Sequence, residues 1–213
     1  MSTRAFWVWA IAIAAADAVF AALVYARLPE RVPIHWNIEG EPDGWGSRAT
    51  FLWMGPGLIA FGLLLALALP YLSPARFKID PFRETFHILM LFVLMLFGYI
   101  HAFTSVAAMN PGERLGNWLV VGIFVFLSLI GNLLGRVKPN FYVGIRTPWT
   151  LADEEVWRRT HRLGGKLMFW GGLVGAILAA ANLLIPAFVV LLVPGLSPVV
   201  YSFVISKRLE SST

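Results

Sequence analysis

Six long apolar stretches constrain the fold of this chain more than any other feature of its sequence. A helix needs roughly 20 mostly apolar residues to cross the hydrocarbon layer of a bilayer. Six stretches meet that requirement: residues 5–26, 51–72, 86–108, 117–135, 167–185 and 187–205. The last two belong to one uncharged run, in which Asn182 and Pro186 mark the expected turn because proline does not continue a helix regularly. The pattern predicts an all-α integral membrane protein, a bundle of six transmembrane helices.

The composition supports the same class. Hydrophobic residues make up 58% of the 213 residues and charged residues only 14%, whereas soluble domains carry about a quarter charged residues. The formal net charge of +5 lies in short segments beside the apolar stretches, where basic residues set topology and contact lipid headgroups. We therefore expect a multi-pass cell-membrane protein with lipid, and not nucleic acid, as its surroundings. The absence of cysteine excludes disulfides and thiolate metal sites.

The first apolar stretch has a second interpretation. Arg4, the apolar run and the residues Val24 and Ala26 are also compatible with a cleavable signal peptide. The run is long for that role, so an uncleaved first helix is favoured.

The distribution of Lys and Arg predicts the orientation of the bundle. With the N-terminus inside, thirteen basic residues fall on the inner side: Arg4, Arg76, Lys78, Arg83, Arg136, Lys138, Arg146, Arg158, Arg159, Arg162, Lys166, Lys207 and Arg208. Only four fall on the outer side: Arg27, Arg31, Arg48 and Arg114. We therefore expect both termini in the cytoplasm (N-in/C-in), the segment 27–50 outside and the segment 138–166 inside. The two ends of the bundle are called outer and inner in this sense.

The outer segment is expected to be a compact, hairpin-like loop. Pro29 and Pro33 disfavour helix, the sequence VPIHWNI favours an extended piece, and Asp43-Gly44 is typical of a tight turn. The candidate partner-binding residues are His35, Asn37, Gly40, Asp43 and Gly44. One imidazole among carboxylates could also ligate a divalent metal, but the spacing matches no established ligand pattern.

The inner segment 138–166 concentrates polar residues between two apolar stretches. Pro139, Pro148 and Gly144 indicate a non-helical first part. Thr150 as N-cap, with Asp153 three residues later, predicts a short cytoplasmic interfacial helix over 151–163 that ends at Gly164-Gly165.

Two interpretations of this segment remain open: an interfacial helix with a structural role, or a surface that binds a cytoplasmic partner. On the expected helix Trp157 and His161 share a face. Arg146 could bind a carboxylate or phosphate, and His161 could change charge near physiological pH. The candidate partner-binding residues are Asn140, Gly144, Arg146, Thr147, Trp149, Thr150, Trp157, Thr160, His161 and Arg162.

Two intramembrane residues are candidates for function. Asp17 lies near the middle of the first span, where an ionisable group is costly. It could relay protons or be a protonated carboxyl that is hydrogen-bonded to a neighbouring helix. His101, in the third span, could approach His35 of the outer loop, which would favour a metal site. Pro194 and Pro198 interrupt the sixth span, and broken helices can mark transport sites.

Two motifs resemble signatures of the bacterial SdpI immunity-protein family. The outer motif LP-x-x-[IV]-P-x-H-x-N-x-x-G-x-x-D-G is filled by Leu28, Pro29, Val32, Pro33, His35, Asn37, Gly40, Asp43 and Gly44. The inner motif N-x-x-[IV]-G-I-R-T-P-W-T-L, followed by W-x-x-T-H-R, is filled by Asn140, Gly144, Ile145, Arg146, Thr147, Pro148, Trp149, Thr150, Leu151, Trp157, Thr160, His161 and Arg162. The resemblance divides the chain into an N-terminal module, residues 1–72, and an SdpI-like membrane domain, residues 73–213.

The resemblance implies a membrane immunity and signalling protein. Such a protein resists a secreted toxic peptide outside and holds a regulator at the membrane inside. The sequence contains no catalytic triad, HExxH motif or phosphate-binding loop, so we expect a non-enzyme without cofactor or metal. The alternatives are a small proton-coupled transporter, based on Asp17 and the sixth span, and a membrane metalloenzyme using His35, His101 and the loop carboxylates.

Overall fold

The apolar stretches form helices that could cross a membrane. The computed structural model describes residues 1–211, and within them six helical spans are long and apolar enough. They are α1 (Thr3–Tyr25), the second span made of α2 (Arg48–Leu52), a π-helical segment (Trp53–Gly57) and α3 (Leu58–Leu72), then α4 (Arg83–Met109), α5 (Gly116–Leu134), α7 (Glu154–Ala180) and α8 (Leu184–Glu210). The all-α, six-helix membrane fold is confirmed. Residues 212–213 of the predicted domain 73–213 lie outside the described residues.

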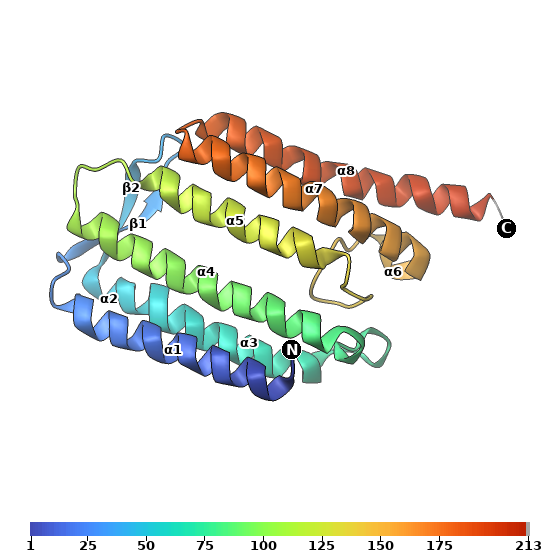
Figure 1. Cartoon of the computed structure of the whole chain (residues 1–213), viewed down its shortest axis with the longest axis horizontal. Coiled ribbons are helices and arrows are strands. Elements are labelled where there is room, and N and C mark those ends of the chain that lie inside the picture. The colour runs from blue at the N-terminus through green and yellow to red at the C-terminus, as the bar shows by residue number, and fades with distance from the viewer. Residues whose placement is uncertain (212–213) are drawn as a thin grey trace.

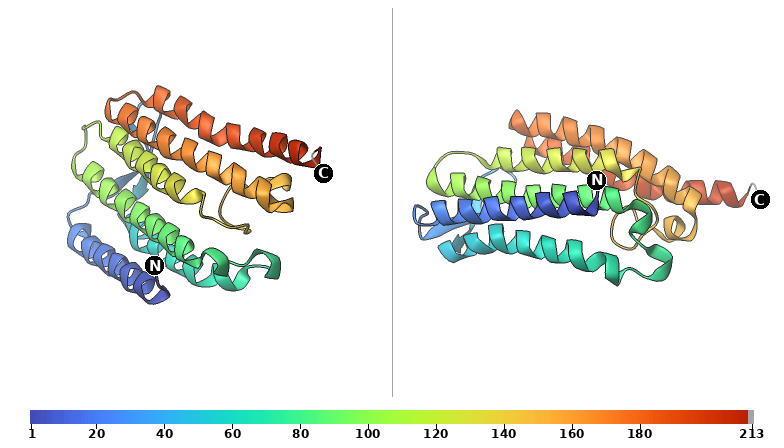
Figure 2. Two further views of the ribbon diagram at one scale, coloured as in Figure 1. Left: turned by 45° about the vertical axis from the view of Figure 1, so that its right-hand side comes forward. Right: turned by 60° about the horizontal axis from the view of Figure 1, so that its bottom comes forward.

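The helices pack as two groups of three. In the first group, α4 contacts α1 and α3; in the second, α7 contacts α5 and α8. The groups meet mainly where α4 packs against α5 (Figure 1). The same grouping is visible from the two further directions in Figure 2. The predicted division of the chain into modules 1–72 and 73–213 is a different division and stays a prediction.

The outer segment forms a two-stranded antiparallel hairpin. Its strands are β1 (Arg31–Trp36) and β2 (Pro42–Ser47). The expected hairpin is confirmed, but its turn is not at Asp43-Gly44. These residues lie within β2, where Gly44 is paired with His35, and a Cβ at Gly44 would lie 2.7 Å from His35 Cβ. Gly44 therefore allows the two strands to approach each other closely.

The prediction of a separate interfacial helix over 151–163 was wrong. A helix of only five residues, α6 (Pro148–Ala152), is followed directly by α7, which continues through Gly164-Gly165 to Ala180. These glycines do not end the helix. They allow close packing, since a Cβ at Gly165 would lie 2.7 Å from the Gly131 carbonyl oxygen of α5.

The helix caps also differ from the prediction. Thr147, and not Thr150, caps α6, and Thr150 is the third residue of that helix in a reciprocal capping box. Asp153 caps α7, with its carboxylate accepting a hydrogen bond from the Val156 N–H.

Two prolines do not break the sixth span. The helix α8 runs from Leu184 to Glu210 with Pro194 and Pro198 inside it. The expected turn before it is confirmed at Asn182, which has a positive φ of 60°, whereas Pro186 lies in the first turn of α8. The second span carries the irregularity instead, as a π-helical segment that contains Pro56. The observation that favoured a transport site in the sixth span is therefore absent.

Candidate functional sites at the two ends of the bundle

Asn37 and Gly40 build the turn of the outer hairpin. The side-chain oxygen of Asn37 accepts hydrogen bonds from the backbone N–H groups of Glu39 (3.1 Å) and Glu41 (2.9 Å). Gly40 has a positive φ of 77°, a backbone conformation that is costly for residues with a Cβ. These two predicted site residues therefore shape the loop from within.

The hairpin reaches from the first group of helices to the second. Next to its turn, Trp36 at the end of β1 packs against Phe103 of α4, with the ring centroids 5.0 Å apart. Its turn lies on the start of α5, where a Cβ at Gly116 would overlap the Gly40 carbonyl group. A Cβ at Gly40 would also lie 3.4 Å from Leu184 of α8. The outer signature thus closes the outer end of the seam between the two groups.

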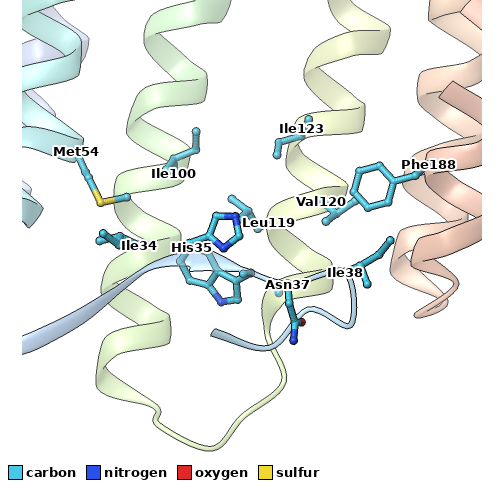
Figure 3. A pocket seen from close by; sticks show the side chains of 12 residues that line it. Ile34, His35, Asn37, Ile38, Met54, Ile100, Leu119, Val120, Ile123 and Phe188 are labelled. Atoms are coloured by element: carbon cyan, nitrogen blue, oxygen red, sulfur yellow. The ribbon is translucent and has the colours of Figure 1, made fainter. Parts of the chain in front are cut away.

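An apolar cavity of about 490 Å³ lies beneath the hairpin. Figure 3 shows the hairpin residues Ile34, His35 and Ile38 along one side of it, with Met54, Ile100, Ile123 and Phe188 from the other elements facing them. The lining side chains come from the hairpin, the π-helical segment, α4, α5 and α8 and include Ile34, Ile38, Met54, Ile100, Leu119 and Phe188. The exposed His35 lies at this cavity, and its Nδ1 is 2.5 Å from Asp43 Oδ1. The cavity offers an apolar interior with one polar pair beside it.

A polar cavity of about 500 Å³ lies beside the hairpin turn. It is lined by Glu39, Arg114, Asn117 and Asn182, among others. The buried side-chain oxygen of Asn117 has no hydrogen-bond partner among the described residues. The outer end thus combines an apolar and a polar cavity at one loop.

At the inner end, Asn140 organises the loop before α6. Its amide nitrogen donates to the carbonyl oxygens of Lys138 and Val143, each at 2.9 Å. Its side-chain oxygen accepts from the N–H groups of Tyr142 and Val143, at 2.8 and 2.7 Å. The residue is fully buried, so Asn140 holds the loop together and is not on its surface.

Trp157 and His161 form the second part of this scaffold, on the face they were expected to share. Their rings are stacked with centroids 3.9 Å apart. The Trp157 indole N–H donates to the Val137 carbonyl oxygen at 2.8 Å. His161 Nδ1 donates to the Trp157 carbonyl oxygen at 2.8 Å, and its Nε2 accepts from the Ile145 N–H at 2.9 Å. Both ring nitrogens are thereby used by a neutral imidazole, because a protonated ring would have no acceptor for Ile145.

Two threonines attach the inner loop to α8. The Thr150 hydroxyl donates to the Ile145 carbonyl oxygen at 2.8 Å, and the Thr147 hydroxyl lies 3.0 Å from the Ser202 hydroxyl. All three hydroxyl residues are buried. Thr160 is also buried, and its hydroxyl has no partner among the described residues.

Few of the predicted inner site residues are exposed. Gly144, Arg146 and Arg162 are exposed and Trp149 is partly so. The Arg146 guanidinium donates to the Phe141 carbonyl oxygen, which orients it on the loop surface. A cavity of about 280 Å³ nearby is lined in part by Lys138, Glu154 and Arg158. The inner signature therefore forms a buried scaffold that presents a charged surface.

The intramembrane residues form a pair that the sequence did not indicate. His101 Nδ1 lies 2.7 Å from Asp17 Oδ1, so His101 faces Asp17 and not His35. Among residues 1–211, no three His, Asp or Glu side chains are placed to share a metal ion. The arrangement that the metalloenzyme alternative requires is therefore not found.

Two further residues were missed. Gly55 of the π-helical segment lies against the His101 ring, and Ser202 of α8 contacts Thr147. The Gly-Pro-Gly run at 55–57 within an apolar span was a usable signal for the first. No sequence signal pointed to Ser202, because serine is common in membrane helices.

The fold defines a multi-pass integral membrane protein with one structured segment at each end of its helix bundle. Comparison with known proteins adds two family matches. The SdpI/YfhL protein family matches residues 136–206, and a domain of unknown function, DUF1648, matches residues 12–60. The first match spans the inner signature and the second includes the outer hairpin.

A curated relative extends the similarity to most of the chain. It is the immunity protein SdpI of Bacillus subtilis (strain 168), which is 28% identical over 160 residues, or 74% of this chain and 73% of the relative. No solved structure matches the chain significantly. The resemblance of the chain to the SdpI family of membrane proteins is thereby confirmed.

Proposed function

We propose that this protein confers resistance to a secreted, membrane-active toxic peptide, which it binds at the outer end of the bundle. The observation that carries the proposal is the pair of cavities at the outer hairpin, one apolar and one polar. Similarity to a protein named as an immunity protein supports the same role. The proposed role requires no catalytic step.

The chemistry of the two cavities fits such a peptide. Membrane-active peptides combine an apolar face with charged groups. The apolar cavity would receive apolar side chains of the peptide. In the polar cavity, the Arg114 guanidinium, the Glu39 carboxylate and the unpaired Asn117 oxygen would receive its charged or amide groups. His35 and Asp43 would contact the peptide between the two.

The inner segment would bind a cytoplasmic regulator through its exposed cations. Asn140 and Gly144 fix the loop that carries Arg146, while Arg162 projects from α7. An acidic surface on the regulator would complement these guanidinium groups. Val137 and Trp157 join this segment to the core of the first helix group. A structural change at the outer end would therefore reach the inner segment through packed side chains.

Protection is tested by expressing the protein in a sensitive bacterial host and challenging the cells with a panel of membrane-active peptides. Cells with the wild-type protein should survive at least one peptide that kills the parent. Ile123→Trp should abolish this protection because the indole would fill the apolar cavity. The matched control is Ile177→Trp, at a position 70% exposed on α7, which should protect like wild type. Killing by every peptide, with the protein inserted at normal levels, would refute the proposal.

The signalling part needs a separate experiment. Cytoplasmic proteins retained on the membranes are compared with and without the protective peptide, in wild type and in Arg146→Ala. The expected result is a peptide-dependent regulator that Arg146→Ala loses and the control Lys207→Ala, at another exposed cation, retains. Equal retention in both variants would exclude Arg146 from the contact.

A further inference from the structure

Asp17 and His101 form a buried acid–base pair between α1 and α4. The Asp17 Oδ1 atom lies 2.7 Å from His101 Nδ1, and the two side chains are 6% and 0% exposed. Along their helices both residues lie about 12 Å from the outer ends, Tyr25 of α1 and Met109 of α4, at the rise of an α-helix. The pair is therefore within the span and not at its surface.

The surroundings of the pair are apolar and shaped to hold the imidazole. The Phe51 ring centroid is 3.9 Å from that of His101, and Phe20 approaches edge-on at 5.4 Å. The π-helical segment places Gly55 against the imidazole, where a Cβ would overlap the ring. The residues that face the pair from the packed elements carry no charge: Phe20 from α1, Phe51 from α2, Gly55 from the π-helical segment and Gly98 from α4.

The hydrogen bonding of the pair is incomplete. Asp17 Oδ2 and His101 Nε2 are buried and have no partner among the described residues. Neither residue makes an ion pair with a third described residue. The pair must therefore balance its own charge, because an uncompensated charge in an apolar membrane interior is costly.

One proton shared between the two groups gives that balance. The pair is neutral overall as carboxylate with imidazolium or as carboxylic acid with imidazole. Losing the proton leaves a lone carboxylate, and gaining a second leaves a lone imidazolium.

Phe51 connects the pair to the root of the outer hairpin. Its side chain is fully buried and belongs to a core cluster with Leu28 and Val32, at the start of the hairpin, and Ala108 of α4. The same ring packs on His101. A charge left at the pair would disturb the packing on which the hairpin rests.

We propose that Asp17 and His101 form a proton-binding site inside the membrane, and that its occupancy by a single proton keeps the outer hairpin docked. The site is distinct from the peptide-binding cavities and does not depend on the proposed immunity.

The proton is observed directly on purified full-length protein in lipid nanodiscs. Infrared spectroscopy reports the Asp17 carboxyl group, assigned with Asp17→Asn, and nitrogen NMR reports the His101 imidazole, assigned with His101→Gln. The two groups together should hold one proton at neutral pH. A carboxylate beside a neutral imidazole at neutral pH, or a proton on both groups there, would overturn the proposal.

The effect on the hairpin is measured by hydrogen exchange of the amides in 31–36 and 42–47. All variants carry His35→Gln, which removes the hairpin's own His35–Asp43 ion pair from the comparison. His101→Phe leaves Asp17 alone and should raise exchange about tenfold, whereas Asp17→Leu with His101→Phe removes both groups and should restore protection. Unchanged exchange in His101→Phe would refute the link to the hairpin. If His101→Phe does not fold, Asp17→Asn is used instead, because it removes one of the two proton-binding groups. Hairpin protection that varies with pH in Asp17→Asn as it does in the parent would refute the link.

Discussion

Removing the side chain of Asn140 should destabilise the inner end of the bundle strongly. Asn140→Ala deletes four hydrogen bonds within a fully buried loop, two donated and two accepted. At about 1 kcal/mol for each bond, the expected loss is roughly 4 kcal/mol of the free energy of unfolding. For a chain of this length that corresponds to a fall in the unfolding midpoint of roughly 8–16 °C.

The assay is thermal unfolding of the purified protein in detergent, together with limited proteolysis of the loop before α6. Asn140→Asp keeps the two accepted bonds but places a carboxylate oxygen against two carbonyl oxygens, so it should also unfold early. The matched control is Lys138→Ala, because the exposed side chain is removed while its backbone carbonyl still accepts from Asn140. A midpoint for Asn140→Ala within about 3 °C of wild type would refute the role assigned to this side chain.

Two further changes test the ends of the bundle. Gly144→Ala should lower the unfolding midpoint, because the backbone has a φ of +121° and a Cβ would overlap His161 Nε2; the strain alone is about 1–3 kcal/mol. A midpoint equal to that of wild type would contradict this. Glu41→Ala should change the midpoint little, since its ion pair with Arg114 at 2.8 Å is exposed and such pairs contribute about 0–1 kcal/mol. A loss above about 2 kcal/mol in thermal unfolding would show that the pair holds the hairpin in place.

The sequence predicts the helices of this protein well because membrane spans are set by length and apolarity alone. The turn at Asn182 was likewise predictable from local chemistry. The same local reasoning failed at Gly164-Gly165, where glycines that can end a soluble helix instead let α7 approach α5 closely. Within a membrane, small residues are selected for helix packing as much as for backbone freedom.

The candidate sites were predictable in part. Asn140 and His161 were identified by residue type, but their burial was not, because a signature motif does not distinguish a contact surface from the scaffold that supports it. The pairing of Asp17 with His101 joins residues 84 positions apart. Each residue was noticed separately, and only the packing of α1 against α4 brings them together.

Each of the two signature segments packs against the helix group to which it does not belong in sequence. The hairpin belongs in sequence to the first group, yet its turn packs on Gly116 and Leu184 of the second. The inner segment belongs to the second group, yet Val137 and Trp157 are part of the core that holds Phe6 and Phe86 of the first. The hairpin therefore joins the two groups at the outer end of the bundle, and the inner segment joins them at the inner end. Separating the two groups at either end of the bundle must therefore break the contacts of the segment that bridges them at that end.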